Sequence, residues 1–187
     1  MKRILCLSAG LGLILLTGCI TLSVYPYYTA KDLTFDAALI GVWSDPGQTN
    51  ADGETWTFER GDEQTYRLTV RDDDRKTEFD ARLFKLKGHL FLDCLPRART
   101  EYFTPGHVLL RVDRLQPRLE MRLLDYEWIG ELIEKNPKAI RHAIIPKSGD
   151  HDPAFVLTAD TAELQKFVLK HIATADAWKE KVVLQRR

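Results

Sequence analysis

The sequence lacks an excess of charge of either sign, because 27 basic residues balance 27 acidic residues over a length of 187. A neutral balance argues against nucleic acid as a partner, since such binding needs a clustered basic surface. The sequence also lacks an uninterrupted apolar run of the roughly 20 residues that cross a bilayer as a helix. We therefore expect neither a nucleic-acid partner nor a membrane-spanning helix.

Familiar catalytic and metal-binding motifs are also missing. The sequence holds no G-x-S-x-G, no P-loop and no G-x-G-x-x-G. A Ser/His/Asp set stays open, because such residues meet in space rather than in sequence. Neither H-x-H nor H-x-x-x-H spacing occurs among the five histidines, which are His89, His107, His142, His151 and His171. We predict that the chain is not an enzyme and that it holds no metal and no cofactor.

Two weaker patterns point to metal ligands. Gln48 to Glu59 follows the spacing of a calcium loop, with Gly53 at the correct offset, but a glutamine replaces the first aspartate and a strand is expected to follow. Asp150-His151-Asp152 is a compact cluster, although neighbouring side chains in one loop rarely all reach the same ion. We interpret the first pattern as a turn that Gly53 assists and the second as a solvated loop.

Three carboxylates stand near the ends of predicted strands: Asp93, Asp113 and Asp125. A partly buried carboxylate can act as a catalytic acid or base. The interpretation that we favour is structural, in which each caps a turn or pairs with an arginine. The arginines available nearby are Arg97, Arg111 and Arg114.

The first residues have the features of a secretory signal peptide. Lys2 and Arg3 precede an uncharged and largely apolar segment from Ile4 to Thr17. This segment is too short to span a bilayer, and small residues close it, as signal peptides require.

The segment ends in Leu16-Thr17-Gly18-Cys19, which resembles the bacterial lipobox: a leucine, two small residues and an invariant cysteine. In lipoproteins the cut falls before this cysteine, whose thiol carries a diacylglycerol and whose new amino group carries an acyl chain such as palmitate. The resemblance implies removal of residues 1–18 and stable membrane attachment through lipidated Cys19. Ile20 stands where an aspartate often marks inner-membrane retention, which implies the inner leaflet of the outer membrane, facing the periplasm.

Cysteine is scarce in the remaining chain. Cys6 leaves with the signal peptide and Cys19 is lipidated, so Cys94 is left as a single free thiol. An internal disulfide is excluded, and the fold must be held by its hydrophobic core. Cys94 alternates with Leu90 and Leu92, which favours a small buried side chain over a reactive thiol.

Residues 19–33 are predicted to form a lipidated tether, and residues 34–187 a single domain. The tether is not rich in glycine or serine. Its aromatic run, Tyr25 to Tyr28, is expected either to sit at the lipid headgroups or to pack against the domain.

From Leu39 to Leu124 the dominant pattern is period two, typical of half-buried strands. We predict seven strands, around Leu39–Trp43, Trp56–Phe58, Tyr66–Arg71, Phe79–Leu86, Leu90–Cys94, Val108–Asp113 and Leu119–Leu123. The alternation changes phase between Leu83 and Phe84, which indicates a bulge or a strand buried on both faces. Short connections make the sheet an antiparallel meander, and closing such a sheet removes its edges.

The pattern changes after Asp125, which can cap a helix that ends at Asn136-Pro137. A strand is predicted at Phe155–Thr158, followed by a helix that Asp160 and Glu163 begin with capping-box spacing. Lys181–Gln185 can return as a last strand.

Gly41-Val42-Trp43 on the first strand resembles the G-x-W that opens lipocalin-like barrels, and the order of meander, late helix and closing strand is similar. The helix after Asp125 departs from the lipocalin pattern. The expected fold is mainly β with added helices (α+β): a curled antiparallel meander or lipocalin-like barrel with one inserted and one C-terminal helix.

Two functions remain open. The first is a non-catalytic structural or interaction module of the cell envelope, which predicts an exposed apolar patch on the Trp128 helix or around Tyr25 to Tyr28 and an envelope protein as partner. The second is lipocalin-like binding of a small hydrophobic ligand or lipid. Ten side chains would line that site: Trp56, Phe58, Tyr66, Leu68, Phe79, Leu90, Leu92, Val108, Leu110 and Met121.

Overall fold

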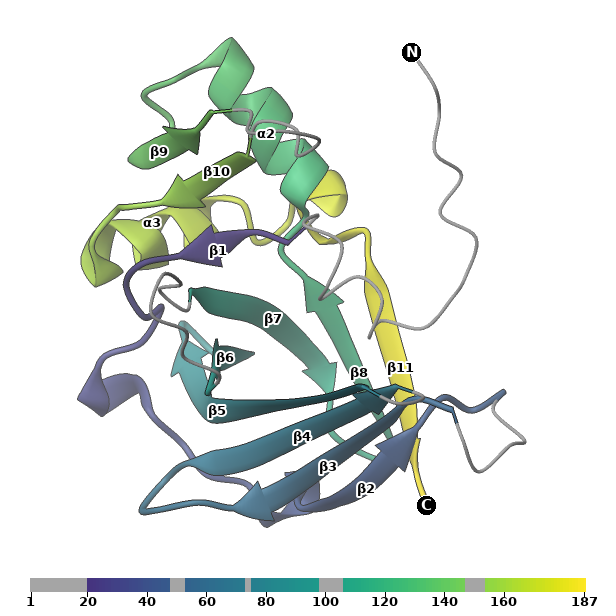
Figure 1. Cartoon of the computed structure of the whole chain (residues 1–187). Coiled ribbons are helices and arrows are strands. Elements are labelled where there is room, and N and C mark those ends of the chain that lie inside the picture. The colour runs from purple at the N-terminus through teal and green to yellow at the C-terminus, as the bar shows by residue number, and fades with distance from the viewer. Residues whose placement is uncertain (1–19, 48–52, 73–74, 98–105, 147–153) are drawn as a thin grey trace.

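The computed structural model describes residues 20–47, 53–72, 75–97, 106–146 and 154–187; the predicted signal peptide and its Leu16-Thr17-Gly18-Cys19 motif lie outside them. Eight strands form a closed antiparallel barrel (Figure 1). Seven follow one another and pair in sequence order: β2 (Gly41–Ser44), β3 (Thr55–Arg60), β4 (Tyr66–Asp72), β5 (Arg75–Leu86), β6 (His89–Pro96), β7 (His107–Arg114) and β8 (Arg118–Leu123). The eighth, β11 (Lys181–Arg186), pairs with β8 and with β2 and closes the barrel.

The seven predicted meander strands and the returning last strand are therefore confirmed. Of the two expected arrangements, a curled open sheet and a barrel, the structure has the barrel. Closure uses only two residue pairs between β11 and β2, Gln185 with Ser44 and Arg186 with Trp43. The helix inserted after β8 does not interrupt the barrel, because the chain returns to it as β11.

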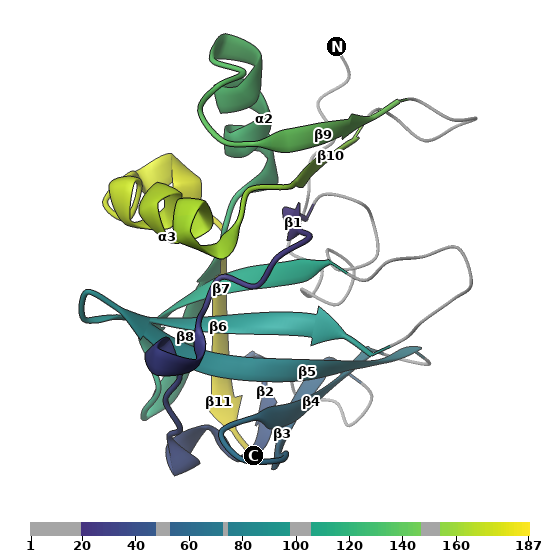
Figure 2. The same cartoon turned by 90° about the vertical axis from the view of Figure 1, so that its left-hand side faces the viewer.

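A second layer lies outside the barrel, next to β7 (Figure 2). It contains a small sheet in the order β1 (Leu22–Ser23), β10 (Ala154–Leu157), β9 (His142–Ile145), which continues from β7. It also contains the two predicted helices, α2 (Tyr126–Lys135) and α3 (Thr161–Lys170). Short 3-10 turns occur at Ala30–Asp32, Ala37–Leu39 and Ala175–Trp178. None of the helices in the described residues is long and apolar enough to cross a membrane.

Both helices begin at the aspartate that the sequence indicates. Asp125 Oδ1 accepts a hydrogen bond from the Trp128 N–H at 2.8 Å, and Asp160 Oδ1 accepts one from the Glu163 N–H at 2.9 Å. Each bond satisfies one of the N–H groups that the first turn of a helix leaves without a backbone partner.

Strand β5 is buried on both faces, which explains the change of phase in its sequence. Leu83 points into the barrel and Phe84 points into the outer layer, and both are fully buried. The β5–β6 pairing is regular across these positions, so the alternative of a bulge does not apply there. Phe84 stacks on Phe91 of β6 with ring centroids 5.4 Å apart, and this pair joins the barrel wall to the helical layer.

Residues 20–33 pack against the domain, which is one of the two arrangements that the sequence left open. Leu22 and Ser23 pair with β7 on one side and with β10 on the other. Tyr27 is fully buried, whereas Tyr25 stays 48% exposed. The segment is thus an integral part of the fold.

The G-x-W sequence has a physical basis at the end of the barrel. Trp43 is buried, and its Nε1–H donates to the Leu39 carbonyl oxygen at 2.9 Å. The Arg186 guanidinium lies 4.8 Å from the Trp43 ring centroid and donates to the carbonyl oxygens of Ile40 and Ala38. Gly41 has a φ of +137°, and a Cβ there would lie 2.7 Å from Arg186 Nη1. The glycine therefore allows the backbone turn and leaves room for the arginine.

We expect Gly41→Ala to lower the free energy of unfolding by about 1–2 kcal/mol more than Gly88→Ala. Both glycines have positive φ, but a Cβ at Gly88 would meet no atom within 4 Å, so Gly88→Ala reports backbone strain without displacing a neighbour. Urea unfolding of the two variants measures the difference. Equal losses would mean that Arg186 moves aside without cost.

Candidate functional site

The barrel interior is filled by the side chains that the sequence predicted as ligand-lining. Nine of the ten are buried in one interior cluster, and Leu90 is partly buried against it. The nine are Trp56, Phe58, Tyr66, Leu68, Phe79, Leu92, Val108, Leu110 and Met121. The sequence therefore identified correctly which side chains face inward, but not whether they enclose a cavity.

A cavity of about 10 Å³ lies between these side chains, beside Trp56, Phe79 and Leu110. That volume is roughly the minimum that one water molecule requires. An eight-stranded barrel is just wide enough for side chains to fill it, and bulky residues fill this one. A lipid-sized ligand would enter only if the core repacked.

Cys94 also lines this small cavity and is almost fully buried. Burial, and then the negative charge of Asp93, raise the pKa of the Cys94 thiol well above its usual value. A protonated thiol inside a packed core is a weak nucleophile. The position matches the structural interpretation of Cys94.

One end of the barrel is covered by the segment that precedes β2. Phe35 stacks on the Tyr66 ring with centroids 4.9 Å apart. The Tyr66 hydroxyl accepts from the Asp36 N–H at 2.7 Å and donates to the Asp36 carbonyl oxygen at 3.1 Å. Leu39, from the same segment, is buried in the interior cluster. These contacts cover the part of this end that lies over Tyr66 and Leu39.

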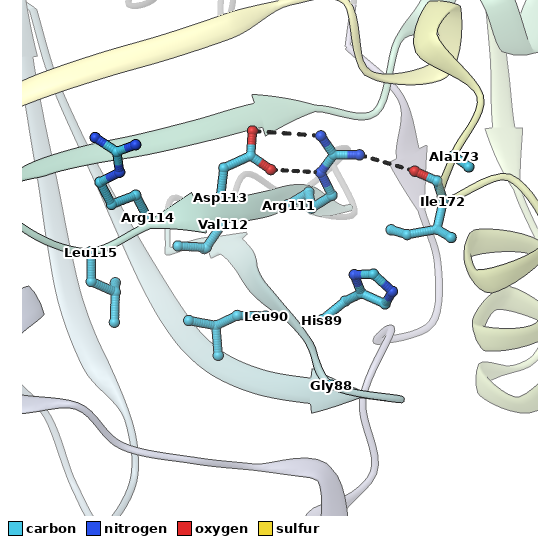
Figure 3. A pocket seen from close by; sticks show the side chains of 10 residues that line it. All are labelled: Gly88, His89, Leu90, Arg111, Val112, Asp113, Arg114, Leu115, Ile172 and Ala173. Carbon is cyan, nitrogen blue, oxygen red and sulfur yellow. Dashed lines mark hydrogen bonds and ion pairs between the residues drawn. The ribbon is translucent and has the colours of Figure 1, made fainter.

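An open groove of about 640 Å³ lies where β6 begins and β7 ends (Figure 3). Leu90, Val112 and Leu115 give it apolar walls. The stretch Ile172–Ala173, which follows α3, forms another side. Val112 belongs to the interior cluster, and Leu90 and Leu115 pack against it. The groove therefore opens at the barrel end that the segment before β2 covers in part.

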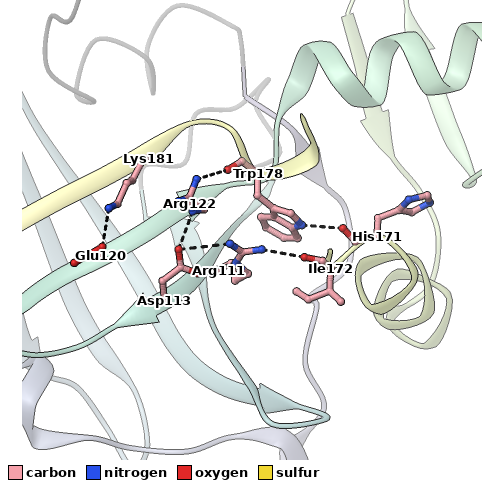
Figure 4. Close-up of polar contacts among 8 residues, drawn as sticks. All are labelled: Arg111, Asp113, Glu120, Arg122, His171, Ile172, Trp178 and Lys181. Carbon is pink, nitrogen blue, oxygen red and sulfur yellow. Dashed lines mark hydrogen bonds and ion pairs between the residues drawn. The ribbon is translucent and has the colours of Figure 1, made fainter. Parts of the chain in front are cut away.

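An ion-pair network borders the groove and binds the stretch after α3 to the barrel wall (Figure 4). Arg111 donates from Nε to Asp113 Oδ1 at 2.8 Å and from Nη1 to the Ile172 carbonyl oxygen at 3.0 Å. Arg122 donates from Nε to Asp113 Oδ2 at 2.8 Å and from Nη1 to the Trp178 carbonyl oxygen at 3.1 Å. Partial burial alone would raise the pKa of Asp113, but its bonds to the two arginines outweigh that effect and hold the pKa below its ordinary value.

The groove therefore offers mainly apolar contact. Arg111 pairs with Asp113, and Arg114 pairs with Glu120 at 3.1 Å, so both guanidinium groups already face a carboxylate. An anionic ligand would have to compete with these pairs, whereas the apolar walls accept a neutral or amphipathic group. His89 adds an exposed imidazole at one side.

A second group of polar residues is buried between the barrel and the N-terminal segment. Asp93 is 1% exposed; its Oδ1 lies 2.6 Å from His107 Nδ1, and its Oδ2 accepts the Tyr27 N–H at 3.0 Å. Burial, followed by the charge of Asp93, raises the pKa of the Tyr27 phenol above its usual range. Asp93 thus ties strands β6 and β7 to the N-terminal segment.

Asp93 contacts His107 Nδ1 as the aspartate contacts the histidine in a Ser/His/Asp set. Ser23 pairs directly with His107 across the β1–β7 ladder. Ser23 is fully buried, however, and its hydroxyl donates to the Tyr25 carbonyl oxygen at 2.9 Å. A nucleophile must reach the substrate and hand its proton to the base. This serine faces neither solvent nor a free base.

The three carboxylates near strand ends all have structural partners. Asp93 binds His107, Asp113 binds two arginines, and Asp125 caps α2 and lies 3.4 Å from Lys179 Nζ. In the part of the chain that is described, no three His, Cys, Asp or Glu side chains gather to hold a metal ion. Asp150-His151-Asp152 and residues 48–52 of the calcium-like pattern lie outside the described residues.

Sequence reasoning did not find the groove. Its residues come from three separate stretches, Gly88–Leu90, Arg111–Leu115 and Ile172–Ala173, and no local pattern connects the last of these to the barrel. No sequence motif singled out His107 either, since it lies outside any H-x-H or H-x-x-x-H spacing. The exposed patch expected on the Trp128 helix is not found, because Trp128 is half-buried against Phe167 and His171.

Compared with known proteins, the chain matches no described family, no curated protein and no solved structure.

We expect Asp93→Leu to lower the free energy of unfolding by about 3 kcal/mol or more, because a side chain of similar size leaves His107 and the Tyr27 N–H buried without their partner. Asp113→Leu is the matched control, since it removes a carboxylate from an ion pair that stays in contact with water and should cost about 1 kcal/mol or less. Chemical denaturation measures both losses. Amide hydrogen exchange at Leu22–Tyr27 should accelerate in Asp93→Leu alone, and equal losses in both variants would contradict the assigned role.

Proposed function

We propose that this chain is a lipid-anchored lipoprotein of a bacterial cell envelope, attached at the inner leaflet of the outer membrane and facing the periplasm. Its domain serves as a non-catalytic structural or interaction module. The filled barrel is the observation that carries the module role, because a cavity of about 10 Å³ leaves the outer surface as the place where binding occurs. The anchor rests on Leu16-Thr17-Gly18-Cys19, directly before the first described residue.

We also propose a lipocalin-like plan for the fold. It is supported by Gly41-Val42-Trp43 on the first barrel strand, by the meander order and by a closing strand after the last helix. Under this plan the alternative function is binding of a small hydrophobic ligand or lipid. The groove beside Leu90, Val112 and Leu115 supports that alternative better than the interior does, because its volume of about 640 Å³ falls in the usual range of ligand sites.

The anchor has a direct test in a diderm bacterial host. Intact mass spectrometry of the full chain, extracted from the membrane fraction, should give a polypeptide that starts at Cys19 and carries the mass of a diacylglycerol and one further acyl chain. Cys19→Ser should lose the lipid mass and remain uncut, whereas Cys6→Ser is the matched control and should behave as the natural sequence does. A mature chain without lipid, or one that starts elsewhere, would defeat the anchor.

The packed interior predicts a bare protein. Residues 20–187, rather than a chain shortened to the barrel, should be used, because Leu22, Ser23 and Tyr27 belong to the fold. A native mass spectrum should give the polypeptide mass alone, unchanged after incubation with fatty acids and phospholipids. A discrete excess mass that disappears on denaturation would instead establish ligand binding.

A further inference from the structure

The proposed lipid anchor at Cys19 directly precedes the first residue that pairs with the folded domain, Ile20. Ile20 forms a β-bridge with Asp125, and Leu22 and Ser23 are held between β7 and β10. The Val24 N–H donates to the Leu157 carbonyl oxygen at 2.9 Å, and the Tyr27 N–H donates to buried Asp93. One peptide bond joins Cys19 to Ile20, so their Cα atoms are about 3.8 Å apart.

This short connection limits how the domain can sit on a membrane. Acyl chains on Cys19 would lie in the hydrocarbon, which holds the cysteine at the headgroup layer. Ile20 would then lie within a few residues' length of the same layer, and the strand pairing of β1 would prevent the domain from swinging away. A domain anchored through a flexible linker can turn any face toward the membrane, whereas this domain would keep one edge next to it.

The strand registers identify which edge that is. Leu22 is level with Val156 of β10, and continuing the parallel register places Ile20 near the level of Ala154. Ala154 pairs with Ile145 of β9. Ile20 and Ile145 therefore lie at the same end of the small sheet, two strand spacings or roughly 10 Å apart.

The edge carries apolar side chains that the domain does not cover. Ile144 is 59% exposed and Ile145 is 51% exposed. Adjacent strand residues point to opposite faces, so the end of β9 is covered on neither face. β9 is also the last strand of its sheet, beyond β10 (Figure 2). Of the five large apolar residues exposed in the described chain, Ile144 and Ile145 lie at this end of the sheet, Val24 and Tyr25 follow β1 at its opposite end, and Val42 lies on strand β2.

We propose that the end of the β1–β10–β9 sheet, marked by Ile20, Ile144 and Ile145, rests on the phospholipid surface and fixes the orientation of the domain. The proposal rests on the proposed anchor at Cys19 and adds to it the face that contacts lipid. A lipid surface is favoured as the occupant over a protein because the edge adjoins the attachment point itself. Two exposed isoleucines beside an acylated residue extend the apolar contact to the domain.

The test uses the full chain, processed and lipidated in a diderm bacterial host and then reconstituted into phosphatidylcholine vesicles. A polarity-sensitive fluorophore is attached to Ile145→Cys or, as the matched control, to Val42→Cys, an exposed apolar strand residue on the barrel. Cys94 is 3% exposed and does not compete for the label under native conditions. Quenching by lipids that carry a nitroxide near the headgroup should be at least about twofold greater at position 145 than at position 42, since interfacial residues lie about 5–10 Å into this boundary.

A second variant tests the cause of the orientation. A flexible insert of twelve glycine and serine residues between Cys19 and Ile20 adds a span of about 20 Å. The protein should stay in the membrane fraction while quenching at position 145 falls to the level at position 42. Quenching that persists would mean that Ile144 and Ile145 bind lipid without help from the short connection, which overturns the anchor-imposed orientation.

The possible failures are distinguishable. If the reconstituted chain carries no lipid and does not float with vesicles, the anchor fails and the orientation fails with it. If it floats but positions 145 and 42 are quenched equally, the anchor stands and the proposed edge is wrong. If position 145 is unquenched in vesicles but protected from thiol labelling in intact envelopes, a protein covers the edge instead of lipid.

Discussion

The barrel wall formed by β5, β6 and β7 is the constraint on which the rest of the structure depends, because its strands are buried on both faces. Leu83 and Leu92 face the interior, whereas Phe84 and Phe91 face the helical layer. The wall thus serves two hydrophobic cores at once. Removing apolar area from water on both faces stabilises the barrel and also holds α2, α3 and the N-terminal segment against it. A substitution in this wall would affect both layers.

The double use of one wall has consequences for function. Large side chains fill the inside of the barrel and leave a cavity of about 10 Å³ beside Trp56 and Phe79. Two features of the described chain stay open to solvent: the groove beside Leu90 and Val112 at one end of the barrel, and the edge of β9 in the outer layer. The Arg111–Asp113–Arg122 network and the buried Asp93–His107 pair connect the surrounding segments to the barrel.

Much of the fold could be predicted because its signals are local. Period-two alternation located all seven meander strands, and Asp125 and Asp160 marked the starts of both helices. Strands β1 and β9 were missed for a physical reason. β1 has only two residues and takes its place from β7 and β10, while His142–Ile145 carries exposed apolar side chains with no alternation.

The sequence by itself determined the barrel strands, their inward-facing residues, the helix caps and the lipobox resemblance, since each depends on residues close together in the chain. Only the tertiary structure decided that the interior is filled, because packing depends on how side chains from eight strands meet in one volume. Tertiary structure also decided that residues 20–27 are part of the fold and that Asp93 bonds with His107 and Tyr27. Those partners lie 14 and 66 residues from Asp93 in the chain, beyond the reach of any local pattern.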